Sequence, residues 1–136
     1  FRILATDIDT DILDRAAAGL YPLEMFERLP ADLRPLLRFE GQTGRGEARI
    51  SDDLKRLIAF KRLNLIESWP MKGAFDVVFC RNVFIYFDTP TKAAILDRFV
   101  SLIHPGGFLY LGHSESLPQP HPKLRLIGRT IYERTP

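Results

Sequence analysis

Long hydrophobic runs are absent from this sequence, and cysteine occurs only once. The longest apolar stretches contain five or six residues, whereas a membrane-spanning helix needs about 20, so we expect no direct membrane insertion. The lone Cys80 cannot form an internal disulfide, which is typical of a reducing, cytoplasmic compartment. The 19 basic and 17 acidic residues nearly balance, so the overall charge does not indicate a nucleic-acid-binding protein.

The chain nevertheless contains enough apolar material for one domain. It has 136 residues, of which 46% are hydrophobic and 26% are charged, a composition that favours a folded core over disorder. The first residues, FRILATD, have the pattern of a strand that is already under way, and Phe1 is not an initiator methionine. We therefore expect a fragment, or a mature chain that lacks a structured N-terminal part.

A strand followed by a helix is predicted at the start of the chain. Residues 3–6 are apolar or tolerant of β-structure, as in a buried parallel strand. Asp9 or Thr10 can cap the helix that follows, and Gly19 can end it. The apolar positions of this helix repeat at helical spacing: Ile12, Leu13, Ala16, Ala17 and Leu20.

Residues 21–57 interrupt this alternation with prolines and glycines. They predict short helical pieces in LEMFERL, ADL and LLRF, a flexible turn in GQTGRG, and a hairpin between LLRFE and EARIS. Ser51 is a good N-cap for one further helical turn. An insertion of this length is too long for an idle loop, so we expect a small subdomain over residues 21–57.

From residue 58 onward, strands and helices alternate again. Strands are predicted in IAFKRLNL, FDVVFC and FLYLGH, and a closing antiparallel pair in LRLIG and TIYER. Thr89 is the predicted cap of a helix with Pro90 at its first position, and HPGG is predicted to stop it. This order predicts a mostly parallel sheet covered on both faces, whose ligands bind beyond the carboxyl ends of the strands.

Polar residues at the predicted strand ends are the candidates for chemistry. Asp7 ends the first strand, where a carboxylate can accept hydrogen bonds from both hydroxyls of a ribose; its position fits a helix-capping aspartate equally well. Arg81 and Asn82 follow a buried strand and need partners, because a buried unpaired polar group costs about 1–3 kcal/mol. A ligand rim or a structural network with neighbouring carbonyls would supply them. Tyr86 is typical of core packing with its hydroxyl at the surface.

The segment GHSES groups a histidine, two serines and a glutamate without a recognisable catalytic pattern. A serine hydrolase is excluded because no G-x-S-x-G elbow is present. Ser114 and Glu115 fit a solvated loop or a helix cap, and Cys80 fits a small buried hydrophobe. No metal site is expected, because short spacing and cysteine partners are missing among the histidines, His104, His113 and His121.

Taken together, ILATDIDTDIL, FDVVFCRNVFIYF and HPGGFLYLGHSESL, with the spacing among them, resemble the CheR-type family of chemotaxis receptor methyltransferases. The combination of CRNVxIYF with GHSE is the most specific part of the likeness, which covers nearly the whole chain. Members of this family use S-adenosylmethionine (SAM), with S-adenosylhomocysteine (SAH) as product, to methylate glutamate side chains of chemoreceptors. The resemblance implies an α/β fold: a Rossmann-like class I methyltransferase sheet within residues 1–136, incomplete at the N-terminus, with an inserted β-subdomain at residues 21–57.

The resemblance also implies roles for individual residues and for partners. Tyr86 would approach the methyl-transfer centre, where a phenol positions a carboxylate without blunting its attack as a strong cation would. The implied partners are cytoplasmic helices of chemoreceptors and a receptor tail peptide at the β-subdomain, with no nucleic acid. The implied cofactor pocket has Asp7 at the ribose hydroxyls, Asn64 and Leu65 along the adenine, and contributions from Arg81 and Asn82.

One departure from the family pattern bears on activity. In the family, a glycine-containing first strand-to-helix turn and a basic helical domain precede the equivalent of ATDID, and neither occurs in this chain. We therefore expect only part of the cofactor pocket here, and activity from a full-length protein rather than from this chain alone. Two other functions stay open: a SAM- or SAH-sensing scaffold without catalysis, and a methyltransferase with a different acceptor.

Overall fold

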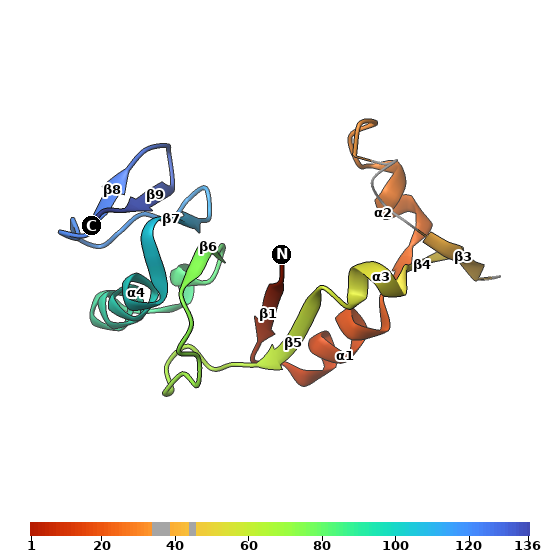
Figure 1. The fold of residues 1–136 in the computed structure, drawn as a ribbon, viewed down its shortest axis with the longest axis horizontal. Helices are drawn as coiled ribbons and strands as arrows, with labels where there is room; N and C mark the ends of the chain where they lie inside the picture. The colour runs from red at the N-terminus through yellow and green to blue at the C-terminus, as the bar shows by residue number, and fades with distance from the viewer. Residues whose placement is uncertain (34–38, 44–45) are drawn as a thin grey trace. The chain divides into compact units, whose positions relative to one another are not determined.

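The computed structural model describes residues 1–33, 39–43 and 46–136. It divides the chain into two compact parts (Figure 1), an N-terminal unit, Phe1–Asn64, and a C-terminal unit, Leu65–Pro136. Each unit has its own sheets and helices. Within the described ranges, no helix is both long enough and apolar enough to cross a membrane.

The N-terminal unit begins with a pair of parallel strands. β1 (Ile3–Asp7) pairs in parallel with β5 (Ile58–Arg62), and α1 (Thr10–Ala18) packs against both strands. The Asp9 carboxylate caps α1 by accepting hydrogen bonds from two N–H groups of the first helical turn. Gly19 ends the helix with a φ of 66°, in the left-handed region that glycine adopts most easily. The predicted strand, helix, cap and stop are therefore confirmed, but Leu20, predicted as an apolar position of the helix, lies after the stop and begins the strand Leu20–Pro22.

A small antiparallel sheet follows, with the strand order β2–β4–β3. The pairing of β3 with β4 confirms the predicted hairpin only in part, and Ser51 caps the predicted helical turn. Of LLRFE, Phe39 and Glu40 lie in β3, and residues 41–43, predicted to belong to a flexible turn, continue that strand. Residues 34–38 and 44–45, which include most of LLRF and part of GQTGRG, lie outside the described residues. The elements of this segment are β2 (Leu20–Pro22), α2 (Leu23–Glu27), β3 (Phe39–Thr43), β4 (Glu47–Ile50) and α3 (Asp52–Lys55).

The C-terminal unit contains a mixed four-stranded sheet with the order β6–β7–β9–β8. β6 (Phe75–Cys80) and β7 (Ile103–Leu111) pair in parallel, and α4 (Thr89–Leu102) connects them. β9 (Ile131–Arg134) is antiparallel to β7 and to β8 (Leu124–Leu126). The predicted helix and the predicted closing antiparallel pair are confirmed.

The structure corrects the predicted ends of α4. The N-cap is Asp88 rather than Thr89: its Oδ1 accepts a hydrogen bond from the N–H of Thr91 at 2.9 Å, and a carboxylate is the better acceptor at a helix N-terminus. HPGG does not form a stop after the helix. Ile103 follows α4 directly as the first residue of β7, and HPGG lies within that strand, where the register with β6 shifts.

The parallel strands lie in two separate sheets, one made of β1 and β5 and the other containing β6 and β7. The single, mostly parallel sheet expected from the sequence is therefore not formed by the described residues. Among the described residues, β1 pairs with β5 alone and β6 pairs with β7 alone, so no strand joins the two sheets. β6 is thus an apolar edge strand with unpaired backbone groups along one side.

The core of the C-terminal unit lies between α4 and one face of its sheet. Ile95, Leu96 and Phe99 of the helix pack with Leu109 and Leu111 of β7, and each of these side chains is at most 6% exposed. The buried face of α4 is thus formed by Ile95, Leu96, Phe99 and Val100, which repeat at helical spacing. Burial of these large side chains is the main source of stability in the unit.

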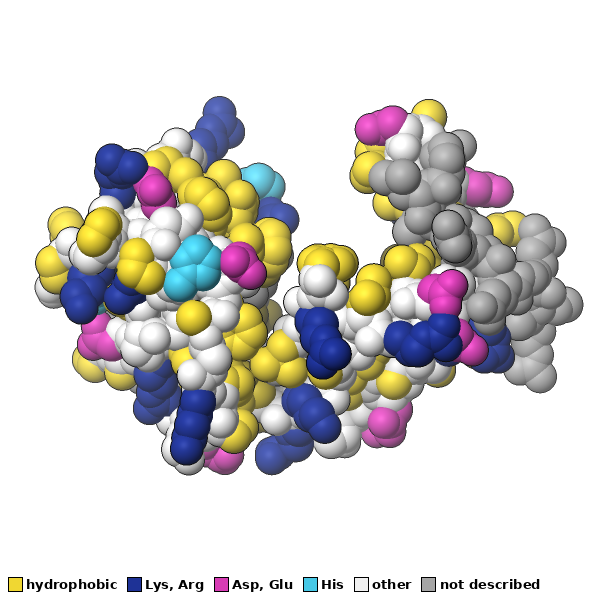
Figure 2. Space-filling model, viewed as in Figure 1, with side chains coloured by type: hydrophobic (Ala, Val, Ile, Leu, Met, Phe, Trp, Pro, Cys, Tyr) yellow, Lys and Arg dark blue, Asp and Glu magenta, His cyan; other side chains and the backbone are white. Residues whose placement is uncertain are grey.

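Within the C-terminal unit, the opposite face of this sheet carries exposed apolar side chains. Val77 and Phe79 of β6 are 38% and 70% exposed, and the Phe79 ring stacks on Tyr110 with a centroid separation of 4.8 Å. Hydrophobic side chains accordingly remain visible on the surface of the molecule (Figure 2). The prediction of strands buried on both faces is wrong for β6 here, and also for β1, whose residues are half-buried or exposed.

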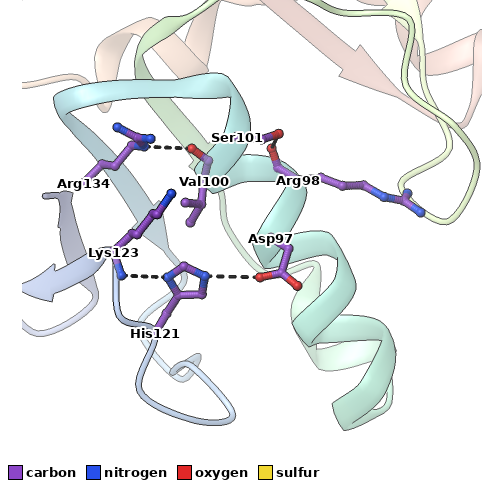
Figure 3. A network of polar contacts seen from close by, with 7 residues as sticks. All are labelled: Asp97, Arg98, Val100, Ser101, His121, Lys123 and Arg134. Carbon is purple, nitrogen blue, oxygen red and sulfur yellow. Dashed lines mark hydrogen bonds and ion pairs between the residues drawn. The ribbon is translucent and has the colours of Figure 1, made fainter. Parts of the chain in front are cut away.

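Polar contacts join α4 to the C-terminal segments that pack beside it (Figure 3). The Nε of Arg134 donates to the carbonyl of Val100 at 2.9 Å. The Nδ1 of His121 accepts from the N–H of Lys123 at 3.1 Å, so the proton of the neutral ring lies on Nε2 and points to Asp97, 3.1 Å away. These bonds join α4 to β9 and to the segment that precedes β8.

Truncation of the core should be costly in the C-terminal unit. Leu109 has no exposed surface, so Leu109→Ala should lower the free energy of unfolding by about 2–5 kcal/mol. Leu126 is 57% exposed, so Leu126→Ala should change it by no more than about 0.5 kcal/mol. Urea unfolding measures both variants, and equal losses would contradict this assignment of the core.

Candidate functional site

Asp7 lies at the carboxyl end of β1, where its half-buried side chain begins the turn into α1. Its Oδ1 accepts a hydrogen bond from the N–H of Asp9 at 3.0 Å, whereas the helix itself is capped by Asp9. The alternative prediction, that Asp7 caps the helix, is therefore wrong. Its second carboxylate oxygen accepts no hydrogen bond from any described residue, which leaves an acceptor at the strand end.

Asn64 and Leu65 lie where the two units meet in sequence. The N–H of Leu63 donates to the carbonyl of Asp7 at 2.9 Å, so Asn64 follows the end of β5 on the same sheet edge as Asp7. Leu65 begins the C-terminal unit and packs against its core. The N-terminal unit thus brings Asp7 and Asn64 to one edge.

Arg98 of α4 fixes the backbone that follows Leu65. Its Nη1 donates to the carbonyls of Leu65 and Glu67 at 2.9 and 2.7 Å, and Trp69 donates from Nε1 to the same Leu65 carbonyl at 3.2 Å. The Arg98 guanidinium also lies 5.5 Å from the centre of the Trp69 ring. Neither residue was predicted from the sequence. Arg98 lies about 30 residues from its partners, and the bond of Trp69 to Leu65, four residues away, follows no recognised local pattern.

The loop after β6 carries the remaining predicted residues. Asn82 has a φ of 59°, in the left-handed region that side chains other than glycine rarely adopt, and a short 3-10 helix, Phe84–Tyr86, follows it. Phe84 is 1% exposed and anchors the loop in the core. Arg81 and Asn82 are both exposed, so the prediction that their side chains are buried is wrong, and exposure removes the need for a structural network to pair them.

Tyr86 is 78% exposed. The core-packing interpretation of this side chain is therefore wrong, and its phenol lies at the surface. The N–H of Tyr86 donates to the carbonyl of Val83 at 3.2 Å, which closes the short helical turn. The loop thus presents three exposed polar side chains, Arg81, Asn82 and Tyr86, after the carboxyl end of β6.

Glu115 is the residue that holds this loop in place. Its Oε2 accepts hydrogen bonds from the N–H groups of Asn82 at 2.8 Å and Gly112 at 2.6 Å, and its Oε1 accepts from the N–H of Ile85 at 3.3 Å. The residue is 5% exposed. The interpretation of Glu115 as a solvated loop residue is therefore wrong. Gly112 belongs to the same GHSES segment, but Asn82 and Ile85 lie 33 and 30 residues away, so the segment alone contained no signal for the contact with the loop.

The Glu115 carboxylate is ionised at neutral pH. Burial raises the pKa of this carboxyl, but the hydrogen bonds from the N–H groups of Gly112, Asn82 and Ile85 lower it more, and the pKa lies below its ordinary value of 4.5. The negative charge thus remains in place, where it keeps accepting hydrogen bonds on both oxygens.

Gly112 allows this close approach at the end of β7. A Cβ atom at this position would lie 2.5 Å from Oδ1 of Asn82 and 2.5 Å from Oε2 of Glu115, well inside contact distance. The residue is buried. Glycine is therefore required here by space, because any side chain would separate the carboxylate from the loop.

Cys80 and the histidines add no further reactive group. Burial raises the pKa of the Cys80 thiol to about 12, with a smaller contribution from the charge of Glu115, so it stays protonated. This agrees with the prediction of a small buried hydrophobe. Among the described residues, no cluster of three or more histidine, cysteine or acidic side chains could hold a metal ion.

Comparison with known proteins adds a further observation. The chain matches the family described as CheR methyltransferase, SAM binding domain, over residues 1–132. It is 43% identical to Chemotaxis protein methyltransferase 2 of Pseudomonas aeruginosa over 134 residues, which is 96% of this chain and 48% of that protein. It is 49% identical to the Probable chemotaxis protein methyltransferase of Rhizobium etli over 116 residues, 85% and 43% of the two chains.

A third relative is more distant but equally extensive. The chain is 37% identical to the Chemotaxis protein methyltransferase of Escherichia coli over 134 residues, 97% of this chain and 47% of that protein. The chain therefore spans about half the length of the curated relatives that it matches. The family match over residues 1–132 includes β1 and the loops after β6 and β7.

Gly112→Ala should disrupt the contact between Glu115 and the loop. The added methyl group would force the Glu115 carboxylate or Asn82 to move, and we expect a loss of about 1–3 kcal/mol in the free energy of unfolding. Gly73→Ala is the matched control, because nothing lies within 4 Å of its added Cβ. Thermal or urea unfolding compares the two, and equal stability of both variants would contradict the steric argument.

Proposed function

The chain belongs to the CheR methyltransferase family, and on this premise we propose that the protein transfers a methyl group from SAM to glutamate carboxylates of chemoreceptors. The observation that carries the proposal is the match to the SAM binding domain over residues 1–132. Relatives named chemotaxis protein methyltransferase, at 37–49% identity, support the same activity.

The residues at the strand ends fit the chemical groups of SAM. A ribose offers two hydroxyl donors, and Asp7 has a carboxylate oxygen that accepts no hydrogen bond within the described residues. The exposed Arg81 and Asn82 bring donors for carboxylate or hydroxyl groups to the loop after β6. In the proposal, Asp7 binds the ribose, Asn64 and Leu65 lie along the adenine, and Arg81 and Asn82 complete this part of the pocket.

The chemistry requires positioning rather than a strong base. A glutamate side chain of the substrate is already ionised at neutral pH, so no group of the enzyme has to remove a proton. SAM supplies an electrophilic methyl group when bound. The chain's own task is to hold the substrate oxygen in line and to exclude water from it.

Tyr86 is the side chain proposed to position that substrate oxygen. Its exposed phenol can donate one hydrogen bond to the carboxylate, which orients an oxygen and leaves most of its charge available for attack. A cation in the same place would bind the carboxylate more tightly and make it a weaker nucleophile. A neutral donor therefore suits this position.

We propose that the complete pocket needs more protein than this chain. The relatives are about twice as long, and β6 has an unpaired apolar edge beside an exposed aromatic face within the described part. Such a strand is typical of a sheet that further chain completes into a Rossmann-like methyltransferase sheet. The full-length protein should therefore carry the activity, and residues 1–136 alone should not.

The proposed partners are the cytoplasmic helices of chemoreceptors, which places the protein in the cytoplasm. The three-stranded sheet of β2, β4 and β3 lies within residues 21–57, the segment proposed to act as a β-subdomain. There, a receptor tail peptide is the proposed ligand. This part of the proposal rests on the family resemblance.

Asp7→Ala in the full-length protein should weaken binding of SAH. Loss of hydrogen bonds between ribose hydroxyls and a charged carboxylate is worth about 1.5–3 kcal/mol, or roughly 10–100-fold in Kd. Asp14→Ala, on the exposed side of α1, is the matched control and should leave the Kd unchanged. Calorimetry measures both, and equal affinity of Asp7→Ala and the parent would remove Asp7 from the pocket.

Tyr86→Phe in the full-length protein should lower the rate of methyl transfer and not the affinity for SAH. We expect turnover of the receptor substrate to fall by about tenfold or more, with little change in the Kd for SAH. Tyr110→Phe, which also keeps its ring and lies in the same unit, should retain parental turnover. The assay measures transfer of labelled methyl groups to receptor under saturating SAM. Unchanged turnover in Tyr86→Phe would show that the phenol has no role in methyl transfer.

A further inference from the structure

We propose that Glu115 is a positioning residue for methyl transfer: its carboxylate sets the conformation of the loop that carries Arg81, Asn82 and Tyr86. This inference rests on the proposed function. Glu115 reaches the reaction only through the loop, because every hydrogen bond that its side chain accepts comes from a backbone N–H of the protein. It is therefore not itself a catalytic residue.

The carboxylate joins three points of the backbone. Oε2 accepts from Asn82, directly after β6, and from Gly112, directly after β7, at 2.8 and 2.6 Å. Oε1 accepts from Ile85, inside the 3-10 helix, at 3.3 Å. The ends of two parallel strands and the start of the short helix are thus held by one side chain.

The two anchored loop amides lie directly beside the residues proposed to act on the ligands. The N–H of Asn82 belongs to the peptide group that links it to Arg81, and the N–H of Ile85 belongs to the residue before Tyr86. The first peptide group joins the Cα atoms of Arg81 and Asn82 directly. The second lies one residue before that of Tyr86, whose own N–H donates to Val83, so together these bonds orient the loop segment that carries the three side chains. The same bonds hold Asn82 at its φ of 59°, a conformation that needs compensating contacts in a residue with a side chain.

A carboxylate suits this position better than any neutral side chain. It offers two oxygens that only accept hydrogen bonds, and all of the facing groups are N–H donors. A glutamine of the same shape would point an NH₂ group at one of those donors. Since Glu115 is 5% exposed, water cannot easily take the place of the lost acceptor.

The space around Gly112 supports the same role. An added Cβ there would lie 2.5 Å from both Oε2 of Glu115 and Oδ1 of Asn82. The end of β7, the carboxylate and the loop are therefore in direct mutual contact, with no room between them. The role of Glu115 therefore depends on Gly112, because the glycine has no side chain between the carboxylate and the loop.

The test is a double-mutant cycle in the full-length protein between Glu115→Gln and Tyr86→Phe. Turnover of receptor and SAM is measured for the parent, the two single variants and the double variant. We expect Glu115→Gln to lower turnover at least tenfold, and Tyr86→Phe to have little further effect in that background, because a displaced phenol no longer contributes. Ile95→Val, a truncation in the core of the same unit, is the matched control. It should lower the thermal midpoint and leave the full effect of Tyr86→Phe intact.

Hydrogen exchange of the protein without cofactor gives a second readout. Glu115→Gln should speed exchange at the amides of Asn82, Ile85 and Gly112, and Ile95→Val should not do so selectively. If Glu115→Gln fails to fold, Glu115→Asp replaces it, because it keeps the charge but shortens the side chain by one methylene. The same outcomes are then expected.

The possible failures are distinguishable. Additive effects of Glu115→Gln and Tyr86→Phe, or parental turnover in Glu115→Gln, would overturn the role of Glu115 while an active parent keeps the proposed function. A parent that binds SAH but methylates no receptor would instead overturn the proposed acceptor, and with it the assignment of Glu115 to this reaction. Unchanged exchange at the three amides would overturn the anchoring itself.

Discussion

The hydrogen bonds from the ends of two neighbouring parallel strands to the Glu115 carboxylate are the constraint on which the candidate site depends. A buried charge is costly unless its lone pairs are used, and here backbone N–H groups use both oxygens. These hydrogen bonds fix the backbone of the loop after β6, although the polar side chains of the loop are exposed. Gly112 provides the space, and Phe84 provides the apolar anchor on the other side of the loop.

The two units contribute different parts of the proposed chemistry. The N-terminal unit brings Asp7 and Asn64 to the edge of the β1–β5 sheet, where a carboxylate suits the hydroxyls of a nucleoside. The C-terminal unit presents the hydrogen-bond donors of Arg81 and Asn82 and the phenol of Tyr86 on the loop after β6, which is anchored by hydrogen bonds to Glu115. This division suits an enzyme that needs orientation more than acid–base chemistry, because its substrate is already charged.

Local patterns predicted much of this structure. The cap at Asp9, the stop at Gly19, the β3–β4 pairing and the buried face of α4 follow from residue type and spacing within a few positions. Contacts across long sequence separations were not predictable in the same way. Glu115 and Arg98 bind backbone groups 33 residues away, and no local pattern marks these two contacts, although Glu115 also binds the neighbouring Gly112. The single sheet was expected from element order alone, but strand pairing also depends on partners that are not among the described residues.

If this domain forms part of a SAM-dependent methyltransferase pocket, the full-length protein must bind SAH, and calorimetric titration measures that binding. We expect one-to-one binding with a Kd near micromolar, or about −8 kcal/mol. Absence of detectable binding would contradict it, because a pocket that cannot hold the reaction product cannot carry out the transfer. A scaffold without catalysis would then be the better description.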